Sequence, residues 1–215
     1  MIVILKLVSK LCQLDVEKRP MRYPSDYKGQ ARAKLVEATG RHAKQHGFTG
    51  SGMADLAGAA GVTTGSLYKH FSGKSDLFAT MIKAELQRTA DMYGAVDAAD
   101  STQVSRTLMG YLSLSHVQRP DVGCPLPSLT PEIGRAESEV KLAFEQGVQN
   151  IHANVKALTG DANTAWAVMA QNVGAVMLAR AMQSESLQRE LLKAVRQAGA
   201  QLMGSQKPHP PMARH

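Results

Sequence analysis

The sequence predicts an all-α protein, with an N-terminal three-helix domain followed by a larger helical domain. Apolar residues recur every three or four positions through most of the chain, which is the spacing of amphipathic helices, and glycines or prolines separate these stretches. Of the 215 residues, 44% are hydrophobic, enough for one good core or for a small module joined to a larger one.

The charge is unevenly distributed. Residues 1–88 hold 14 Lys and Arg against 7 Asp and Glu, whereas the remainder holds 11 of each, so the whole net charge of +7 lies in the first part of the chain. This asymmetry favours a polyanion-binding N-terminal module on a neutral module, although a solvated basic face would give the same count.

The N-terminal stretch MIVILKLVSKLCQL is apolar but contains Lys6 and Lys10. It is shorter than the roughly 20 residues of a membrane span, and no signal-peptide cleavage site follows it. It could form an amphipathic helix, but we expect residues 1–20 to be a start-site extension ending before Met21 or a disordered arm. We therefore place residues 1–27 outside the folded domains.

Three short helices follow. The first covers residues 30–46, and Gly47 stands where it would stop. The second covers residues 52–60, with Ser51 as its N-cap.

The stretch AGAAGVTTGSLYKHF, residues 57–71, then predicts a helix-turn-helix. Two helices that cross at a steep angle need small residues where their backbones approach, which Ala57 supplies, and a turn residue that tolerates positive φ, which Gly61 supplies. Thr63 can cap the third helix, expected from about Thr64 to Phe71. Its polar side chains then face outward, as donors suited to phosphates and base edges.

The segment ADLAGAAGVTTGSLYKHFSGKSDLF resembles the DNA-binding domain of the TetR family of bacterial transcriptional repressors. Two positions depart from the family pattern. Thr64 stands where a basic residue is common, which leaves the base readout open, and Gly58 weakens its helix by about 1 kcal/mol relative to alanine.

The resemblance implies a DNA-binding domain over residues 28–74 and an effector-binding and dimerisation domain over residues 75–205. The expected DNA contacts are Ser51, Thr63, Thr64, Gly65, Ser66, Tyr68, Lys69, His70 and Lys74. Tyr68 and His70 could instead only pack.

Helical patterns continue over residues 75–93, from Asp100 or Ser101 to about Val117, and over 132–158, 162–183 and 186–204. Between them, the proline segment RPDVGCPLPSLTP, residues 119–131, is expected not to form a regular helix. The proline-rich tail, residues 206–215, is expected to be disordered.

The resemblance implies an effector site among these helices. Methionine and aromatic side chains suit apolar ligands, and they suit an ordinary core equally well. The candidate pocket residues are Met92, Met109, Tyr111, Leu112, Phe144, Trp166, Met169 and Met177.

Cys124 lies in a Gly-Cys-apolar segment similar to that of family members that sense oxidants or electrophiles. Sensing requires a thiolate, and Arg119 or Arg135 could supply the charge that stabilises it. The alternative is a small buried cysteine that helps the loop to pack.

Family members dimerise through their last two helices, and these two are apolar enough for that role. Core packing within one chain is the alternative. The expected interface residues are Ala170, Gly174, Met177, Ala181, Leu191 and Val195.

Other classes of function find little support in the sequence. Cys12 and Cys124 form neither a disulfide framework nor a zinc site, and His42 and His46 lack a third ligand. We find no catalytic constellation, so we expect no enzyme, no cofactor and no metal. The prediction is a homodimeric regulator in the bacterial cytoplasm, most simply a repressor of a palindromic operator released by a small-molecule effector. Activators share this fold, and a non-specific DNA-organising protein is the remaining alternative.

Overall fold

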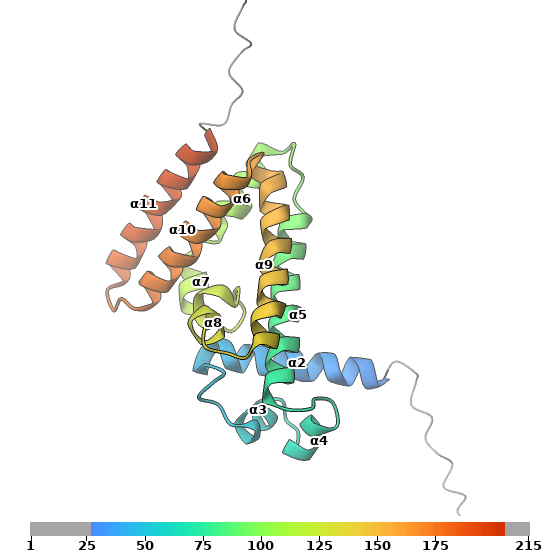
Figure 1. Ribbon diagram of the computed structural model, residues 1–215. Coiled ribbons are helices and arrows are strands. Elements are labelled where there is room, and N and C mark those ends of the chain that lie inside the picture. The colour runs from blue at the N-terminus through green and yellow to red at the C-terminus, as the bar shows by residue number, and fades with distance from the viewer. Residues whose placement is uncertain (1–26, 205–215) are drawn as a thin grey trace, which may run out of the picture. The chain divides into compact units, whose positions relative to one another are not determined.

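The computed structural model describes residues 27–204, so the expectations for residues 1–26 and for the tail lie outside the described residues. The described part is helical throughout and contains no strand, which confirms the all-α prediction (Figure 1). From Arg32 onward it forms one compact unit, to which the first turn of the first described helix does not belong. Within residues 27–204, no helix is long and apolar enough to cross a bilayer.

The helix-turn-helix is built from α2 (Tyr27–His46), α3 (Met53–Ala59) and α4 (Thr64–Tyr68). Gly61 has φ +67° in the turn, and the Thr63 hydroxyl accepts a hydrogen bond from Ser66 N, as the sequence predicts. Leu67 and Phe71 point inward and are at most 2% exposed.

Two local predictions in this domain are wrong. Ser51 does not cap α3, because its hydroxyl donates to Gly47 O and lies 3.2 Å from His42 Nε2, while Gly52 takes the N-cap position. The third helix also ends at Tyr68 rather than at Phe71.

The helices after the helix-turn-helix are organised around α5 (Lys74–Gly94), which packs along α9 (Ser138–Thr159) (Figure 1). The two backbones approach closely at Gly147 of α9, where a Cβ atom would lie 2.5 Å from Leu86 Cδ1. Leu86 is fully buried, so the contact fixes how these helices pack.

The expected helix from Ser101 to Val117 is divided in two, α6 (Ser101–Gly110) and α7 (Leu114–Gln118). The Ser113 hydroxyl accepts from His116 N and starts the second helix. The Ser113 side-chain cap therefore begins a new helix at a point where the apolar pattern alone predicts a continuous one.

The proline segment is also partly helical, contrary to expectation, because α8 runs from Leu126 to Ile133. Proline is tolerated in the first turn of a helix, where the missing N–H has no intrahelical partner, and Pro127 lies there. Pro131 lies in the last turn. As a result the helix expected over residues 132–158 begins only at Ser138.

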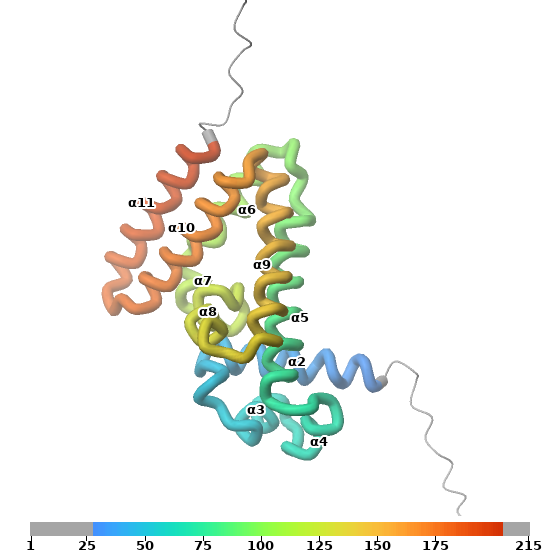
Figure 2. Tube along the Cα trace, in the orientation of Figure 1, coloured from blue at the N-terminus to red at the C-terminus, as the bar shows by residue number. Residues whose placement is uncertain are grey.

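The last two helices are α10 (Ala162–Arg180) and α11 (Glu185–Gly204), which lie side by side and are joined by a short turn (Figure 2). Gly160, with φ +77°, ends α9, and the Asp161 carboxylate accepts from Thr164 N to start α10. Both helices end close to the expected limits.

Candidate functional site: a nucleic-acid face and a cavity behind it

The residues of the turn and of α4 present a polar outer face. Thr63, Gly65, Tyr68 and Lys69 are exposed, and the phenol ring of Tyr68 is an exposed aromatic at 55%. Thr64 and Ser66, half-buried, lie between them. Donors, a cation and an aromatic ring thus share one short helix, and such groups can contact phosphates and base edges.

The remaining candidate DNA contacts are buried or already engaged in contacts within the protein. Ser51 is buried, and the Lys74 ammonium donates to Thr49 O at 2.8 Å while it lies over the Phe48 ring. His70 is half-buried, with a buried Nδ1 that has no hydrogen-bond partner. His42 lies beside His46 and Ser51.

A cavity of about 650 Å³ lies between α5, α6, α7 and the first part of the proline segment. Its walls combine apolar, aromatic and basic side chains. They include Arg88, Met92, Arg106, Tyr111, His116 and Cys124.

The cavity takes in only part of the expected pocket. Met92 and Tyr111 line it, and Met169 lines a separate space of about 10 Å³ that also touches Tyr111. Trp166 is instead 46% exposed and stacks on His152, with 4.1 Å between the ring centroids. The other expected residues line neither space: Met109, Leu112, Phe144 and Met177.

Sequence reasoning missed the basic and histidine residues of the cavity. Arg88 and Arg106 each lie on the polar side of an amphipathic helix, where an arginine is ordinarily solvated. Only the fold brings residues of α5, α6 and α7 around one space, and no spacing along the chain signals it.

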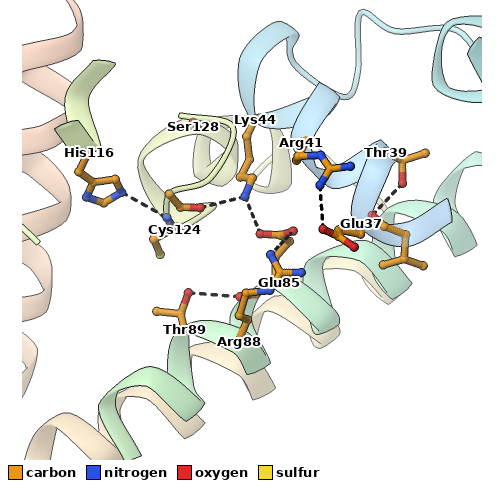
Figure 3. Close-up of polar contacts among 12 residues, drawn as sticks. Glu37, Thr39, Arg41, Lys44, Glu85, Arg88, Thr89, His116, Cys124 and Ser128 are labelled. Atoms are coloured by element: carbon orange, nitrogen blue, oxygen red, sulfur yellow. Dashed lines mark hydrogen bonds and ion pairs between the residues drawn. The ribbon is translucent and has the colours of Figure 1, made fainter. Parts of the chain in front are cut away.

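His116 forms one wall and is fixed by two hydrogen bonds. Its Nδ1 lies 2.8 Å from Tyr111 O, and its Nε2 accepts from Cys124 N at 3.2 Å (Figure 3). Because Nε2 accepts, the ring is neutral and donates from Nδ1. Burial, with the nearby Arg180 and Lys44, lowers the pKa of His116, which agrees with the neutral form.

Cys124 is buried beside this histidine, and burial raises the pKa of its thiol. Lys44 favours the thiolate, but its effect is smaller than that of burial. Burial also holds the pKa of the Tyr111 hydroxyl well above its usual range, and this hydroxyl has no hydrogen-bond partner of good geometry. The arrangement keeps the cysteine as a neutral thiol, the form that reacts slowly.

A buried lysine joins the helix-turn-helix to the cavity wall. Lys44 of α2 forms an ion pair with Glu85 of α5 at 2.7 Å, and the two side chains are 0% and 2% exposed (Figure 3). The same ammonium donates to Gly123 O at 2.9 Å, next to Cys124. The second Glu85 oxygen accepts from Arg88 at 3.0 Å, so one carboxylate links α2, α5 and an arginine of the cavity.

A second connection reaches the loop between α2 and α3. The Glu132 carboxylate of α8 accepts from Phe48 N at 2.9 Å and from Thr49 N at 2.6 Å. α8 follows directly on the cavity wall at Gly123 and Cys124. The segment from Gly123 to Glu132 therefore contacts α2 at its first residue, through Lys44, and the loop after α2 at its last.

Comparisons with known proteins agree with this architecture. Residues 35–81 match the family model described as bacterial regulatory proteins, tetR family. A search of curated protein sequences finds no match to the chain.

Solved structures of regulators resemble it over most of their length. NemR of E. coli in its reduced form is 20% identical, with a TM-score of 0.60 over 78% of this chain and 96% of NemR. A TetR-family regulator from Agrobacterium tumefaciens is 18% identical, with a TM-score of 0.64 over 80% of this chain and 98% of its own.

Another, from Cytophaga hutchinsonii, is 17% identical, with a TM-score of 0.64 over 85% of this chain and 98% of its own. At these identities the likeness establishes the fold. The family match covers the helix-turn-helix and the start of α5. It includes α4, which presents the outward polar face. Residues 35–81 therefore match the DNA-binding part of the TetR family of bacterial regulatory proteins, and the described chain has the fold of solved regulators of that family.

Proposed function

We propose that the protein is a repressor that binds a palindromic operator as a homodimer and leaves it when a small molecule occupies the cavity. In this proposal residues 28–74 bind DNA, and residues 75–205 bind the effector and dimerise. The Lys44 contact carries the proposal, because it joins α2, the helix that precedes the two helices of the turn, directly to the cavity wall at Gly123.

The outer face of α4 makes the DNA contacts. Thr64, Ser66 and Lys69 face the bases of the major groove, while Tyr68 and Lys74 hold the phosphate backbone. Lys74 would give up its bond to Thr49 O or share it with a phosphate oxygen. Ser51 has a supporting part only, because it is buried against His42.

Exposed apolar stripes support dimerisation through α10 and α11. On α10 one stripe contains Trp166, Ala170, Gly174, Leu178 and Ala181, of which Leu178 is 58% exposed. On α11 Leu187 and Leu202 are 46% and 39% exposed. A single chain leaves these side chains in water, and a second copy would cover them.

The effector acts through the wall that Lys44 holds. Gly123 O and Glu85 are the two partners of the Lys44 ammonium. A ligand that displaces either of them moves a partner of Lys44, and so changes the preferred position of α2. Release requires only that the ligand favours a geometry that the operator does not, and coupling of this kind is typically about 1–3 kcal/mol. Cys124 is not the sensing group in this proposal, because its thiol is buried and its pKa is raised.

Binding to DNA tests the proposal first. The purified protein is titrated against the DNA upstream of its own gene and against a shuffled fragment, at about 0.15 M salt, where non-specific contacts weaken. We expect affinity about a thousandfold higher for the native fragment. Equal affinity for this fragment, for those of the neighbouring genes and for the shuffled DNA would favour the DNA-organising alternative.

A further inference from the structure

We propose that the effector is a small organic anion, with an apolar body and a carboxylate or a similar head group. The inference rests on the proposed function, since it names the class of ligand that the same cavity takes. It comes from the charges around the cavity, from its apolar wall and from one buried hydroxyl.

Three arginines line the cavity, and two of them form ion pairs with carboxylates of the protein. Arg88 is paired with Glu85, and Arg119 with Asp121 at 3.2 Å. Within the described residues Arg106 of α6 has neither an ion pair nor a hydrogen bond, although it lines the same space. A guanidinium in this position can bind a carboxylate with two parallel hydrogen bonds.

The acidic group of the cavity does not offset this charge. Glu85 is 2% exposed and is already bound by Lys44 at 2.7 Å as well as by Arg88. A cationic ligand would therefore face three guanidinium groups without a free carboxylate. A neutral ligand would leave Arg106 unused.

The rest of the wall suits an apolar body. Met92 and Val122 are large apolar side chains at 46% and 62% exposure on the cavity, and a ligand would cover them. The ring of Tyr111 and the neutral ring of His116, which meet edge to face at 4.4 Å, add aromatic surface. A volume of about 650 Å³ lies within the range of ordinary ligand pockets.

The Tyr111 hydroxyl is a second point of recognition. The side chain is 8% exposed, the hydroxyl is buried without a hydrogen-bond partner of good geometry, and the residue lines the cavity. The hydroxyl lies beside the Cys124 thiol and has no surface open to the cavity, so a ligand reaches it only if the Tyr111 side chain turns. An acceptor brought to it would then satisfy a buried donor that is otherwise unpaired. An anion with an acceptor at one end and an apolar body meets both requirements.

The same chemistry suggests how the anion acts. Arg88 lies on the cavity and holds one oxygen of Glu85, whose other oxygen holds Lys44 of the helix-turn-helix. An anion beside Arg106 competes with Glu85 for Arg88. Glu85 is then left with Lys44 alone, and the change reaches α2 without passing through Cys124.

The test uses three probes of one shape: 4-phenylbutyrate, its neutral amide and the cationic 4-phenylbutylamine. Binding to the full-length protein is measured by calorimetry, up to about 5 mM of each probe. We expect the acid to bind about tenfold more tightly than the amide or the amine. In Arg106→Gln that preference should be lost, while in Arg135→Gln, which alters an exposed arginine outside the cavity, it should be kept.

Each outcome decides the proposal. Equal binding of acid and amide, no binding of the acid in this range, or an unchanged preference in Arg106→Gln would overturn it. The affinity of each variant for operator DNA without a probe is measured in parallel. Intact operator binding together with any of these results would reject the class of ligand and leave the regulator standing.

Discussion

At the scale of single residues, Lys44 is the most consequential side chain of the molecule. Removing an ammonium and a carboxylate from water costs several kcal/mol for each ion, and their attraction recovers this only when the remaining donors and acceptors are satisfied. Lys44 meets the condition through Glu85 and Gly123 O, and Glu85 through Lys44 and Arg88. The pair therefore depends on α2, α5 and the Gly123 loop being in place together.

We predict that Lys44→Met lowers the free energy of unfolding by about 3 kcal/mol, because Glu85 keeps only the half-exposed Arg88 as a partner. Urea denaturation followed by circular dichroism measures the change. The matched control is Lys83→Met, which removes an exposed lysine of α5 and should stay within about 0.5 kcal/mol of the parent protein.

The double variant Lys44→Met/Glu85→Met separates the charge from the packing. Two apolar side chains leave no buried charge unpaired, so the double variant should be more stable than Lys44→Met alone. If the single and double variants unfold at the same urea concentration, the loss in Lys44→Met comes from packing and the ion pair is unimportant.

At the scale of elements, the pairing of α5 with α9 forms the framework on which the later helices pack. Gly147 allows the close approach because it has no side chain, and Leu86 fills the space above it. Neither residue is exceptional in the sequence. Their contact comes from the register of two helices that are distant along the chain.

We predict that Gly147→Ala destabilises the protein by about 1–3 kcal/mol, because the new methyl group would lie 2.5 Å from Leu86 Cδ1 and 2.6 Å from Leu86 Cβ. Thermal unfolding provides the measurement. Gly58→Ala is the control, since a Cβ there meets nothing within 4 Å and alanine favours the exposed helix α3 by about 1 kcal/mol.

The two glycine variants should thus change stability in opposite directions. A Gly147→Ala protein as stable as its parent would mean that α5 and α9 can separate without cost. The position of Glu85 on α5, and so its contact with Lys44 of α2, would then not depend on the packing against α9.

The elements also show how far the sequence could be read. Apolar periodicity predicted the limits of α5 well, because this helix buries one continuous face along its whole length. The sequence prediction failed at Ser113, where one hydroxyl caps a new helix. It also failed at Pro127, because a proline in the first turn of a helix does not prevent the helix from forming. The cavity was predicted only through Met92 and Tyr111, since its charge and shape arise from segments that are far apart in sequence.

At the scale of the whole molecule, the question is what covers the exposed faces of α10 and α11. A monomer rarely leaves a row of large apolar side chains in water, and Trp166 and Leu178 lie on one such row of α10. Small residues between them, Ala170 and Gly174, would let a second helix approach. This pattern suits a two-fold interface, and two recognition helices bind a palindrome better than one.

We predict that Leu178→Glu converts the protein from dimer to monomer, because two carboxylates would meet near the symmetry axis in place of two apolar side chains. Light scattering coupled to gel filtration measures the mass. Affinity for a palindromic operator should fall by at least about tenfold, because each monomer then contacts only one half-site.

The control for this prediction is Leu142→Glu on α9, since Leu142 is 57% exposed and Leu178 is 58% exposed. Both substitutions place the same charge on an equally exposed helical leucine, so a general loss of stability would affect both alike. If Leu142→Glu gives the monomer and Leu178→Glu stays dimeric, the interface lies on α9 rather than on α10 and α11. If both variants remain dimeric and bind DNA as the parent does, neither leucine is at the interface, and the apolar stripe of α10 faces something other than a second copy.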